Sequence, residues 1–412
     1  MASSNIIIWS LKNRNVKEIF ARLGDVIVGW LIRPFSFITP RNKRKWIIGN
    51  KTGWGDNSKY LRILLENNNE NLRLIWIAKD KSGRDLVRGK GFEAYKKWSI
   101  KGIYHALTAG AYFYSSNIND INYWVSGKVF SINMWHGVGL KKLGMKQSET
   151  YNPKDISTRI FTPFYYHQPS YFIGPSDMMA RHFADCYNMT DKQMLKIGYP
   201  RCEYLLLDNE KRQKFIEKYE SEKIIDLIDN LKIYSKVYVY MPTFRDDQHD
   251  FIKQAGFDFK RLNNILKEKN SILMLKLHPA TRIGDVDFDN FSNLILLDKN
   301  IDIYPLLPST DVLITDYSSI YYDYILMKDK DVILFPFDYK DYVENSRDFA
   351  FDYLTFSPGI KAWNFDELYD IIKEEPDLSF KERDKIIETF WGKNFEKPSM
   401  LIKETTKKNL HF

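Results

Sequence analysis

The chain has 412 residues, too many for one ordinary hydrophobic core, and this length suits two domains of about 150–200 residues each. Apolar residues make up 44% of the sequence and charged residues 28%, a composition that argues against global disorder. The net charge of +8 calls for an anionic partner, such as nucleic acid, an anionic lipid surface or a phosphorylated substrate. Lysines and arginines are spread along the chain without a helix-turn-helix, zinc-finger or aromatic RNA-binding motif, so we expect no nucleic acid partner.

The two cysteines, Cys186 and Cys202, form no disulfide framework and no CxxC metal spacing. A single disulfide between them is open to the sequence, but a reducing cytoplasm is the natural compartment. No segment reaches the roughly 18–20 apolar residues that span a bilayer. We therefore expect a cytoplasmic protein.

Residues 1–44 form an N-terminal helical segment, because apolar side chains recur at close to helical spacing. Its apolar stretch, residues 26–40, is interrupted by Arg33 and Pro34, lies too far from the start for a signal peptide, and precedes basic residues at 41–45. Such a segment could lie in a lipid headgroup interface and make the chain a peripheral membrane protein. The alternative is a helix packed on its own domain, and the sequence leaves both open.

Short apolar strands then alternate with helices, which implies parallel sheets covered by helices. In the first half we expect strands at 46–49, 74–78, 111–114, 130–134 and 195–198, with helices at 58–66, 100–108 and 176–187. In the second half we expect strands at 237–241, 272–277, 294–297, 312–315 and 332–335, with helices at 260–269 and 320–327. Residues 137–169 lack periodicity and indicate a long functional loop.

This pattern predicts an α/β protein of two doubly wound, Rossmann-type domains facing each other across a cleft. The charged helical stretch 210–230 marks the boundary. We expect one Rossmann-like domain at 45–205, a second at 206–375, and a helical tail at 376–412 that packs back on the first domain.

In an open α/β sheet, ligands bind at the carboxyl ends of the strands. The strand at 312–315 ends in Thr315, Asp316, Tyr317, Ser318 and Ser319, and a helix follows. Small hydroxyls and free amides at a helix N-terminus form an anion site. The alternative is that Asp316 or Ser318 merely caps the helix.

Two neighbouring strand ends carry the same kind of side chain. His278 follows one strand and is made rigid by Pro279, and Arg245 follows another and offers a bidentate fork for phosphate. Taken singly, His278 could be a core histidine and Arg245 a partner in a surface ion pair. Because three strand ends carry phosphate-type donors, together they favour a phosphate-binding edge.

In the first half, His136 ends a strand in a basic, glycine-containing loop. Since Gly137 allows close approach, His136 is a candidate general base, and Lys141 and Lys142 could hold an anionic acceptor. The alternative is a buried structural histidine.

These motifs occur together in one order from about residue 49 to about residue 359, roughly three quarters of the chain. They comprise Asp56-Asn57-Ser58-Lys59-Tyr60, Trp135-His136-Gly137, Gly198-Tyr199-Pro200-Arg201, Pro242-Thr243-Phe244-Arg245-Asp246, Lys276-Leu277-His278-Pro279, Thr315-Asp316-Tyr317-Ser318-Ser319 and Ser357-Pro358-Gly359. As a set they closely resemble the CDP-glycerol glycerophosphotransferase family, the polymerases and primases of teichoic acids and related bacterial capsules. The resemblance implies a fold similar to two-domain GT-B glycosyltransferases, with the donor on the C-terminal domain and with no cofactor and no catalytic metal.

The resemblance also implies roles for individual residues. His136 resembles the base that deprotonates the acceptor hydroxyl, with Lys141, Lys142 and Asn57 on the acceptor side. His278 resembles a second catalytic group, which together with Arg245, Ser318 and Ser319 holds the donor diphosphate and its developing charge. Thr315, Asp316 and Arg201 lie in matching donor motifs. Val138-Gly139 and Cys202-Glu203 depart from the family pattern and leave the acceptor open.

The expected activity is transfer of glycerol phosphate, or a related polyol phosphate, from a CDP-activated donor such as CDP-glycerol to a hydroxyl of an anionic polymer or lipid-linked acceptor, with release of CMP. The sequence does not choose between glycerol, ribitol and a glycosylated polyol, nor between primase and polymerase. One alternative is a GT-B glycosyltransferase that uses a nucleotide sugar. Another is a non-catalytic, membrane-associated assembly factor.

Overall fold

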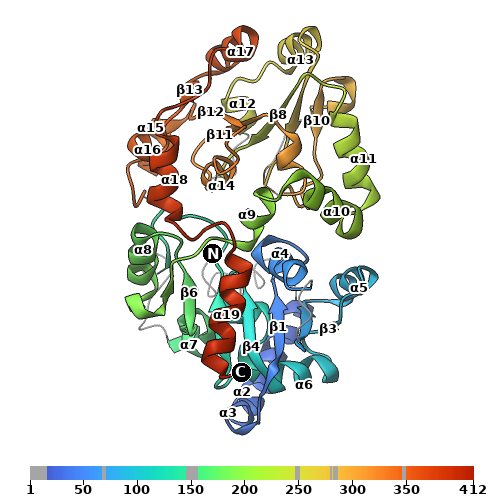
Figure 1. Ribbon diagram of the computed structural model, residues 1–412, viewed down its shortest axis with the longest axis vertical. Helices are drawn as coiled ribbons and strands as arrows, with labels where there is room; N and C mark the ends of the chain where they lie inside the picture. Colours follow the sequence, from blue (N-terminus) through green and yellow to red (C-terminus); the bar gives the residue numbers. More distant parts are fainter. Residues whose placement is uncertain are drawn as a thin grey trace. The chain divides into compact units, whose positions relative to one another are not determined.

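The computed structural model in Figure 1 describes residues 16–66, 71–144, 156–245, 251–278, 281, 286–345 and 349–412. The chain forms two compact units. Unit 1 consists of Met1–His136, Leu143–Glu203 and Trp391–Phe412, and unit 2 of Gly137–Lys142 and Tyr204–Phe390. The sequence placed the boundary two residues further on, at 205/206, and began the returning tail at 376.

Unit 1 is built on a seven-stranded parallel sheet in the order β3-β2-β1-β4-β5-β6-β7. The strands are β1 (Asn42–Gly49), β2 (Arg73–Ala78), β3 (Ala94–Lys96), β4 (Ala109–Tyr114), β5 (Phe130–Asn133), β6 (Tyr171–Ile173) and β7 (Met194–Leu195). Its helices include α4 (Asp56–Leu64), α5 (Lys81–Gly89), α6 (Ile100–Thr108), α7 (Ile156–Phe161), α8 (Asp177–Tyr187), α9 (Pro200–Leu205), which crosses into unit 2, and α19 (Pro398–Leu410). Every residue of β4 is buried, as expected of a parallel strand covered on both faces.

Unit 2 is built on a six-stranded parallel sheet in the order β10-β9-β8-β11-β12-β13. The strands are β8 (Lys236–Met241), β9 (Ser271–Leu275), β10 (Leu294–Leu296), β11 (Val312–Thr315), β12 (Asp331–Leu334) and β13 (Ile360–Lys361). The helices are α10 (Asn209–Tyr219), α11 (Glu222–Leu231), α12 (Phe251–Gln254), α13 (Phe259–Glu268), α14 (Ile320–Tyr324), α15 (Tyr339–Asn345), α16 (Tyr353–Phe356), α17 (Phe365–Glu374) and α18 (Arg383–Trp391), whose last residue falls in unit 1.

Each sheet has a point where the strand order reverses. In unit 1 the chain runs outward from β1 to β3, then returns to β4 beside β1 and runs outward to β7. In unit 2 the same reversal falls between β8 and β11. Connections leave in opposite directions at such a point and open a crevice at the carboxyl ends of the two strands. The predicted doubly wound pattern is therefore confirmed in both units.

Several predicted boundaries differ from the structure. Residues 196–198 lie outside β7, which has only two residues. The helix expected at 320–327 ends at Tyr324, since the amides of Leu326 and Met327 bond three residues back rather than four. The stretch 210–230 is two helices, because the chain restarts at Ser221, whose carbonyl accepts from Ile225. Part of the loop expected at 137–169 forms α7, and residues 145–155 lie outside the described residues.

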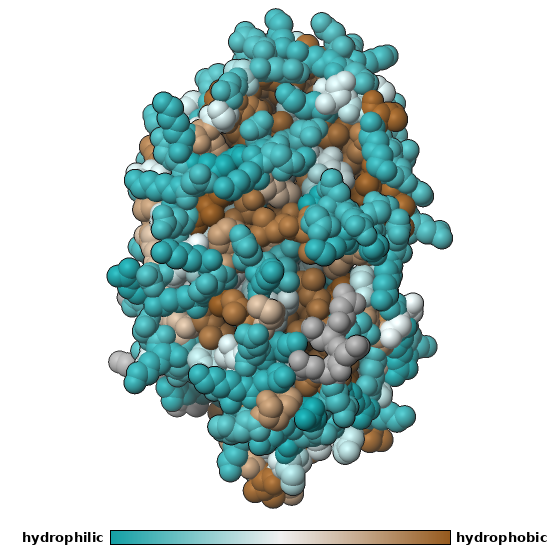
Figure 2. All heavy atoms as spheres, in the orientation of Figure 1, coloured by the Kyte–Doolittle hydropathy of each residue, from teal (hydrophilic) through white to brown (hydrophobic). Residues whose placement is uncertain are grey.

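The N-terminal segment contains α2 (Val16–Ile32) and α3 (Phe35–Ile38), and the expected helical character is confirmed for residues 16–38. Both helices expose large apolar side chains: Ile27, Val28, Trp30, Leu31, Phe35, Phe37 and Ile38. Figure 2 shows brown, hydrophobic atoms at the lower end of the view, where Figure 1 places α3. Among the described helices, none is both long and apolar enough to cross a bilayer. Cys186 and Cys202 are both free and buried.

Candidate active site

His136 lies at the carboxyl edge of the unit 1 sheet, just beyond β5. The chain turns sharply there because Trp135 adopts a left-handed backbone conformation with φ of 58°. The Asn133 side chain supports the turn, since its Oδ1 accepts from the Trp135 amide at 2.9 Å and its Nδ2 donates to the Ser116 carbonyl at 3.0 Å. The side chain after this strained turn, His136, is accessible to solvent.

The ring of His136 is held in one tautomer. Its Nδ1 lies 3.0 Å from the carbonyl oxygen of Ser115, at the end of β4. Because a carbonyl only accepts, Nδ1 carries the proton and Nε2 keeps a lone pair. Desolvation by the surrounding protein lowers the pKa of His136 from its ordinary value, against the opposing charge of Asp56 and with help from Arg201 and Lys51. A neutral imidazole with a free Nε2 lone pair is the form that a general base requires.

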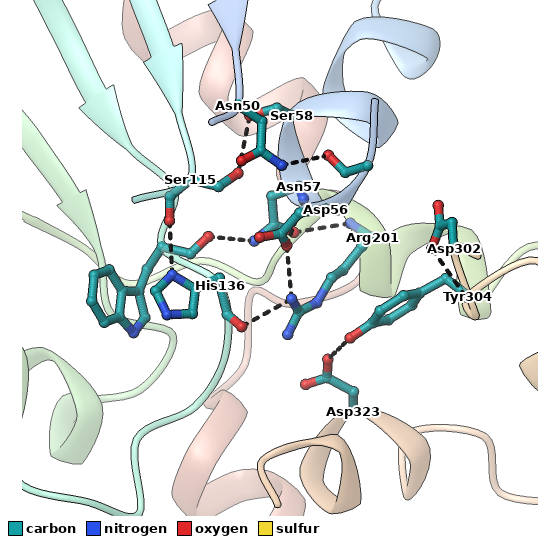
Figure 3. A network of polar contacts seen from close by, with 12 residues as sticks. Asn50, Asp56, Asn57, Ser58, Ser115, His136, Arg201, Asp302, Tyr304 and Asp323 are labelled. Atoms are coloured by element: carbon teal, nitrogen blue, oxygen red, sulfur yellow. Dashed lines mark hydrogen bonds and ion pairs between the residues drawn. The ribbon is translucent and has the colours of Figure 1, made fainter. Parts of the chain in front are cut away.

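Two side chains fix the backbone on either side of that ring (Figure 3). The Asn57 amide donates to the Trp135 carbonyl at 2.9 Å, and the Arg201 guanidinium donates to the His136 carbonyl at 2.9 Å. Arg201 also pairs with Asp56 at 2.7 Å, while its own amide donates to Asn57 Oδ1 at 3.2 Å. Asp56, Asn57 and Arg201 therefore form a frame around the base, in which Asn57 and Arg201 are buried and Asp56 is partly exposed.

Two of the predicted site residues, Asn57 and Arg201, belong to this frame. Asn57 was expected to contact the acceptor, but its side chain has 0% exposure and both ends of its amide are bonded to protein. Arg201 was expected at the donor phosphates, but it lies in the same unit as His136 and pairs with Asp56. In this structure the side chains of Asn57 and Arg201 both contact the backbone next to His136, and their roles in binding stay predictions.

Sequence reasoning missed Ser115 and gave Asp56 no role. Ser115 is also tied to the β1 side, since its Oγ lies 3.0 Å from the Ser58 hydroxyl, which bonds to the Gly49 carbonyl at 2.8 Å. The available signal was positional: Asp56 and Ser58 follow the first strand of a doubly wound domain and Ser115 follows the fourth. These are the two strands that flank the reversal of strand order.

The two lysines after His136, Lys141 and Lys142, have different environments. Lys141 belongs to unit 2, where its amine bonds to the Tyr342 hydroxyl and its backbone forms an antiparallel bridge with Phe349. Lys142 is exposed. In this structure the amine of Lys141 therefore contacts another side chain of the protein. The amine of Lys142 is the more accessible of the two to an anionic acceptor.

In unit 2, the turn after β11 brings together most of the predicted donor residues. Thr315 is buried and donates its hydroxyl to the Met241 carbonyl of β8 at 2.7 Å. Asp316 Oδ1 accepts from the amides of Thr243 at 2.8 Å and Tyr317 at 2.5 Å. Thr315 and Asp316 therefore tie the end of β11 to the end of β8, and their predicted contact with the donor stays a prediction.

Arg245 has a different environment from the open phosphate fork that the sequence suggested. Its guanidinium grips Asp338 through two bonds of 2.7 and 2.9 Å and lies 2.8 Å from Asp316 Oδ2. A further bond of 2.6 Å goes to the Thr243 carbonyl. Burial opposes the charge on Arg245, but Asp316 and Asp338 outweigh this effect and raise its pKa above the ordinary value. The alternative considered from the sequence was a surface ion pair of Arg245. The observed ion pair is buried, and it includes a second carboxylate, Asp338, that the motifs did not indicate.

Polar groups at the same turn remain available to a ligand. Within the described part of the chain, the backbone amides of Ser318 and Ser319 make no hydrogen bond, and neither does the Ser319 hydroxyl. The Thr243 hydroxyl is buried and has no partner among the described residues. Capping does not account for the turn, because Ser319 makes no cap bond and Ser318 Oγ lies 3.5 Å from the Ile320 amide. Unused donors gathered at a switch point are the kind of groups that can bind an anion, and the donor site at this turn stays a prediction.

His278 follows β9, which is the neighbour of β8 on the side away from β11. Its side chain is exposed, and its ring lies 4.7 Å from that of Phe244. The sheet order β9-β8-β11 confirms that the three predicted strand ends are adjacent. Pro279 and Asp246 lie outside the described residues.

Among the described residues, no group of three His, Cys, Asp or Glu side chains could hold a metal ion. The expectation of chemistry without a metal or cofactor stays a prediction.

The family described as CDP-glycerol:poly(glycerophosphate) glycerophosphotransferase matches residues 34–393. The teichoic acid poly(ribitol-phosphate) polymerase of Bacillus spizizenii is 29% identical over 63% of this chain and 40% of its own length. The teichoic acid glycerol-phosphate primase of Bacillus subtilis is 29% identical over 64% of this chain and 63% of its own. The chain thus spans less than two thirds of these curated relatives.

The crystal structure of the wall teichoic acid polymerase TagF is similar to this chain with a TM-score of 0.71 at 21% identity, covering 96% of this chain and 97% of that one. The same polymerase has also been studied after a soak with CDPG. The UDP-GlcNAc 2-epimerase from Methanocaldococcus jannaschii is similar with a TM-score of 0.53 at 10% identity, covering 88% and 99% of the two chains. These similarities support the predicted GT-B-like fold class.

Proposed function

Since the chain belongs to the CDP-glycerol:poly(glycerophosphate) glycerophosphotransferase family, we propose that it transfers glycerol phosphate from CDP-glycerol, or the corresponding phosphate from a similar CDP-polyol, to an acceptor hydroxyl. The acceptor is an anionic polymer or a lipid-linked precursor in teichoic acid or capsule synthesis. The observation that carries the proposal is the fixed tautomer of His136, whose Nε2 can take a proton.

In the proposed reaction, the acceptor hydroxyl gives its proton to His136 Nε2 as its oxygen attacks the phosphorus next to the polyol. A new phosphodiester bond forms to that phosphorus, the bond to the bridging oxygen of the diphosphate breaks, and CMP leaves with the electron pair. Phosphoryl transfer of this kind needs positioning and charge stabilisation more than covalent chemistry. Asp56, Asn57 and Arg201 supply the positioning of His136.

Charge stabilisation falls to the edge of unit 2. The amides of Ser318 and Ser319 and the Thr243 hydroxyl, which have no partner among the described residues, are suited to the donor diphosphate. His278 is exposed at the neighbouring strand end. Its ring is suited to donate a hydrogen bond to the phosphate oxygen on which charge develops as CMP leaves. Arg245 acts indirectly in this proposal. It forms an ion pair with Asp316 and thereby holds the turn after β11 in place.

The test is CMP release by the purified chain with CDP-glycerol, CDP-ribitol and a panel of nucleotide sugars, each with a polymer or lipid-linked acceptor. We expect CMP and a new phosphodiester with a CDP-polyol, loss of turnover in His136→Gln, and normal turnover in the control His411→Gln, whose histidine is exposed near the C-terminus. Near-normal CMP release by His136→Gln would remove His136 as the base.

The other outcomes separate the alternatives. A glycosidic product with release of a nucleoside diphosphate would make the chain a glycosyltransferase that uses a nucleotide sugar. A folded chain that turns over no donor with any acceptor would support the non-catalytic assembly factor.

We also propose that α2 and α3 attach the chain to an anionic membrane surface, as a peripheral protein on the cytoplasmic side. The two helices dock on unit 1 through small and polar residues: Gly29 lies against Trp124, the Ser36 hydroxyl accepts from the Gly127 amide, and Arg33 bonds to Ser126. Ile32 packs against the unit 1 core and Trp30 contacts Trp124, whereas the side chains of Leu31, Phe35 and Ile38 are left outward, with Ile38 78% exposed. A soluble helix buries that face, whereas an interfacial helix presents it to lipid.

Charge complementarity favours an anionic lipid as the occupant, since Lys43 and Arg44 follow α3 and are exposed. The test is co-sedimentation with vesicles with and without anionic lipid. We expect Leu31→Asp combined with Ile38→Asp to abolish sedimentation, and the control Ile100→Asp, at an exposed position on α6, to leave it unchanged. Equal sedimentation of the double variant and the parent chain would end the proposal.

A further inference from the structure

Unit 1 contains a cavity of about 230 Å³ close to the candidate base. The ends of β4, β5 and α8 and the segment 164–169 form its walls. Trp135 joins the cavity to the active site, because its indole lines the cavity and its ring centroid lies 4.0 Å from that of His136. His136 itself is not among the lining residues, so the cavity is a separate space next to the base.

The walls combine aromatic rings with neutral polar groups. Trp135, Tyr165, Tyr166 and Tyr187 supply rings, and Asn117 and Gln168 are among the residues with side-chain amides. Among the described lining residues there is no Asp, Glu, Lys or Arg. A phosphate group would find no counter-charge here, which excludes the phosphate-bearing parts of the donor and the acceptor.

Two polar groups in the walls lack partners. The Nε2 atom of His167 is buried and makes no hydrogen bond to the described residues, and burial lowers the pKa of His167 to about 4, so the ring is neutral near pH 7. The side-chain oxygen of Asn117 accepts from the Asn119 amide, while its NH₂ group has no partner in the described part of the chain. Unpaired groups of this kind favour a ligand with hydroxyls over a plain hydrocarbon chain.

We infer that this cavity binds an uncharged, hydroxylated ring, a sugar residue of the acceptor next to the hydroxyl that reacts. Electron-rich aromatic faces contact the polarised C–H groups of such a ring, and amides and imidazole bond to its hydroxyls. The volume of about 230 Å³ is many times the roughly 10–15 Å³ that a single water needs, so the cavity has room for one ring. The role as an acceptor subsite rests on the proposed function, whereas sugar binding itself does not.

Binding is tested first without catalysis, by saturation-transfer NMR on the full chain. The probes are methyl glycosides of a hexose and of an N-acetylhexosamine, glycerol 3-phosphate and geraniol. Gln168 lines the cavity and is exposed, so Gln168→Trp adds bulk there, and Gln213→Trp on α10 is the control at another exposed glutamine. We expect at least one glycoside to bind the parent and the control and to bind Gln168→Trp at least about tenfold more weakly, at equal melting temperature.

Glycoside binding that Gln168→Trp leaves unchanged, or binding of only geraniol or only glycerol phosphate, would overturn the inference. The second measurement is kinetic. With CDP-glycerol and a sugar-bearing acceptor, Gln168→Trp should raise KM for the acceptor at least about tenfold and leave KM for CDP-glycerol unchanged. A chain without turnover defeats the proposed function but leaves the NMR result to decide the cavity.

Discussion

Replacing Arg245 with methionine tests whether this arginine is a phosphate ligand or a buried structural cation. In the structure its side chain is 5% exposed, and its partners Asp316 and Asp338 are 0% and 6% exposed. Removing the cation leaves two carboxylates in a poorly solvated site, and breaking a buried pair in this way costs about 3–5 kcal/mol. We therefore expect Arg245→Met to lower the free energy of unfolding of unit 2 by about that amount.

The assay is urea unfolding followed by tryptophan fluorescence and circular dichroism, read separately for each transition because two units need not unfold together. The control is Arg261→Met, which breaks the surface pair with Asp366, whose side chains are 41% and 75% exposed, and should cost less than about 1 kcal/mol. Arg245→Met combined with Asp338→Asn should cost less than the sum of the single changes, because the residues are coupled. Unchanged stability together with lost CDP-glycerol affinity would refute this reasoning and restore the phosphate fork.

Three further predictions concern the site. For the acceptor, kcat/KM should fall with decreasing pH along a limb centred below the ordinary histidine value of about 6.5, because desolvation by the surrounding protein lowers the pKa of His136; a limb centred above it would contradict this. Asn57→Ala should destabilise unit 1 by about 1–3 kcal/mol in urea, since it leaves the Trp135 carbonyl and the Arg201 amide unpaired, and no loss would show that water replaces the amide. Ser319→Ala should raise KM for CDP-glycerol about tenfold or more with unchanged melting temperature, and an unaltered KM would remove its hydroxyl from the donor site.

Local sequence pattern was sufficient for the architecture. Runs such as residues 312–315 are mainly apolar, rich in β-branched residues and followed by turn residues. Such a run predicts a strand, with boundaries that are correct to within a few residues. Weak elements escaped because they carry little pattern: β3 and β6 have three residues and β13 has two. Their conformation depends on pairing with a neighbouring strand rather than on their own residues.

The position of His136 was also readable from sequence, because a histidine after a strand in a glycine-containing turn lies at the carboxyl edge wherever the sheet is parallel. Its tautomer was not readable, since Ser115 lies 21 positions away on another strand. The same holds for the frame, in which Arg201 reaches the His136 carbonyl across 65 positions.

The sequence by itself therefore determined which residue types stand at the strand ends, and with them the family pattern. Tertiary structure decided what each one faces. The guanidinium of Arg245 can pair equally well with a phosphate or with a carboxylate. In the folded chain it pairs with the carboxylate of Asp338, which lies 93 positions further along the sequence. Charged side chains act through whatever lies within a few ångströms, and only the folded backbone sets that distance.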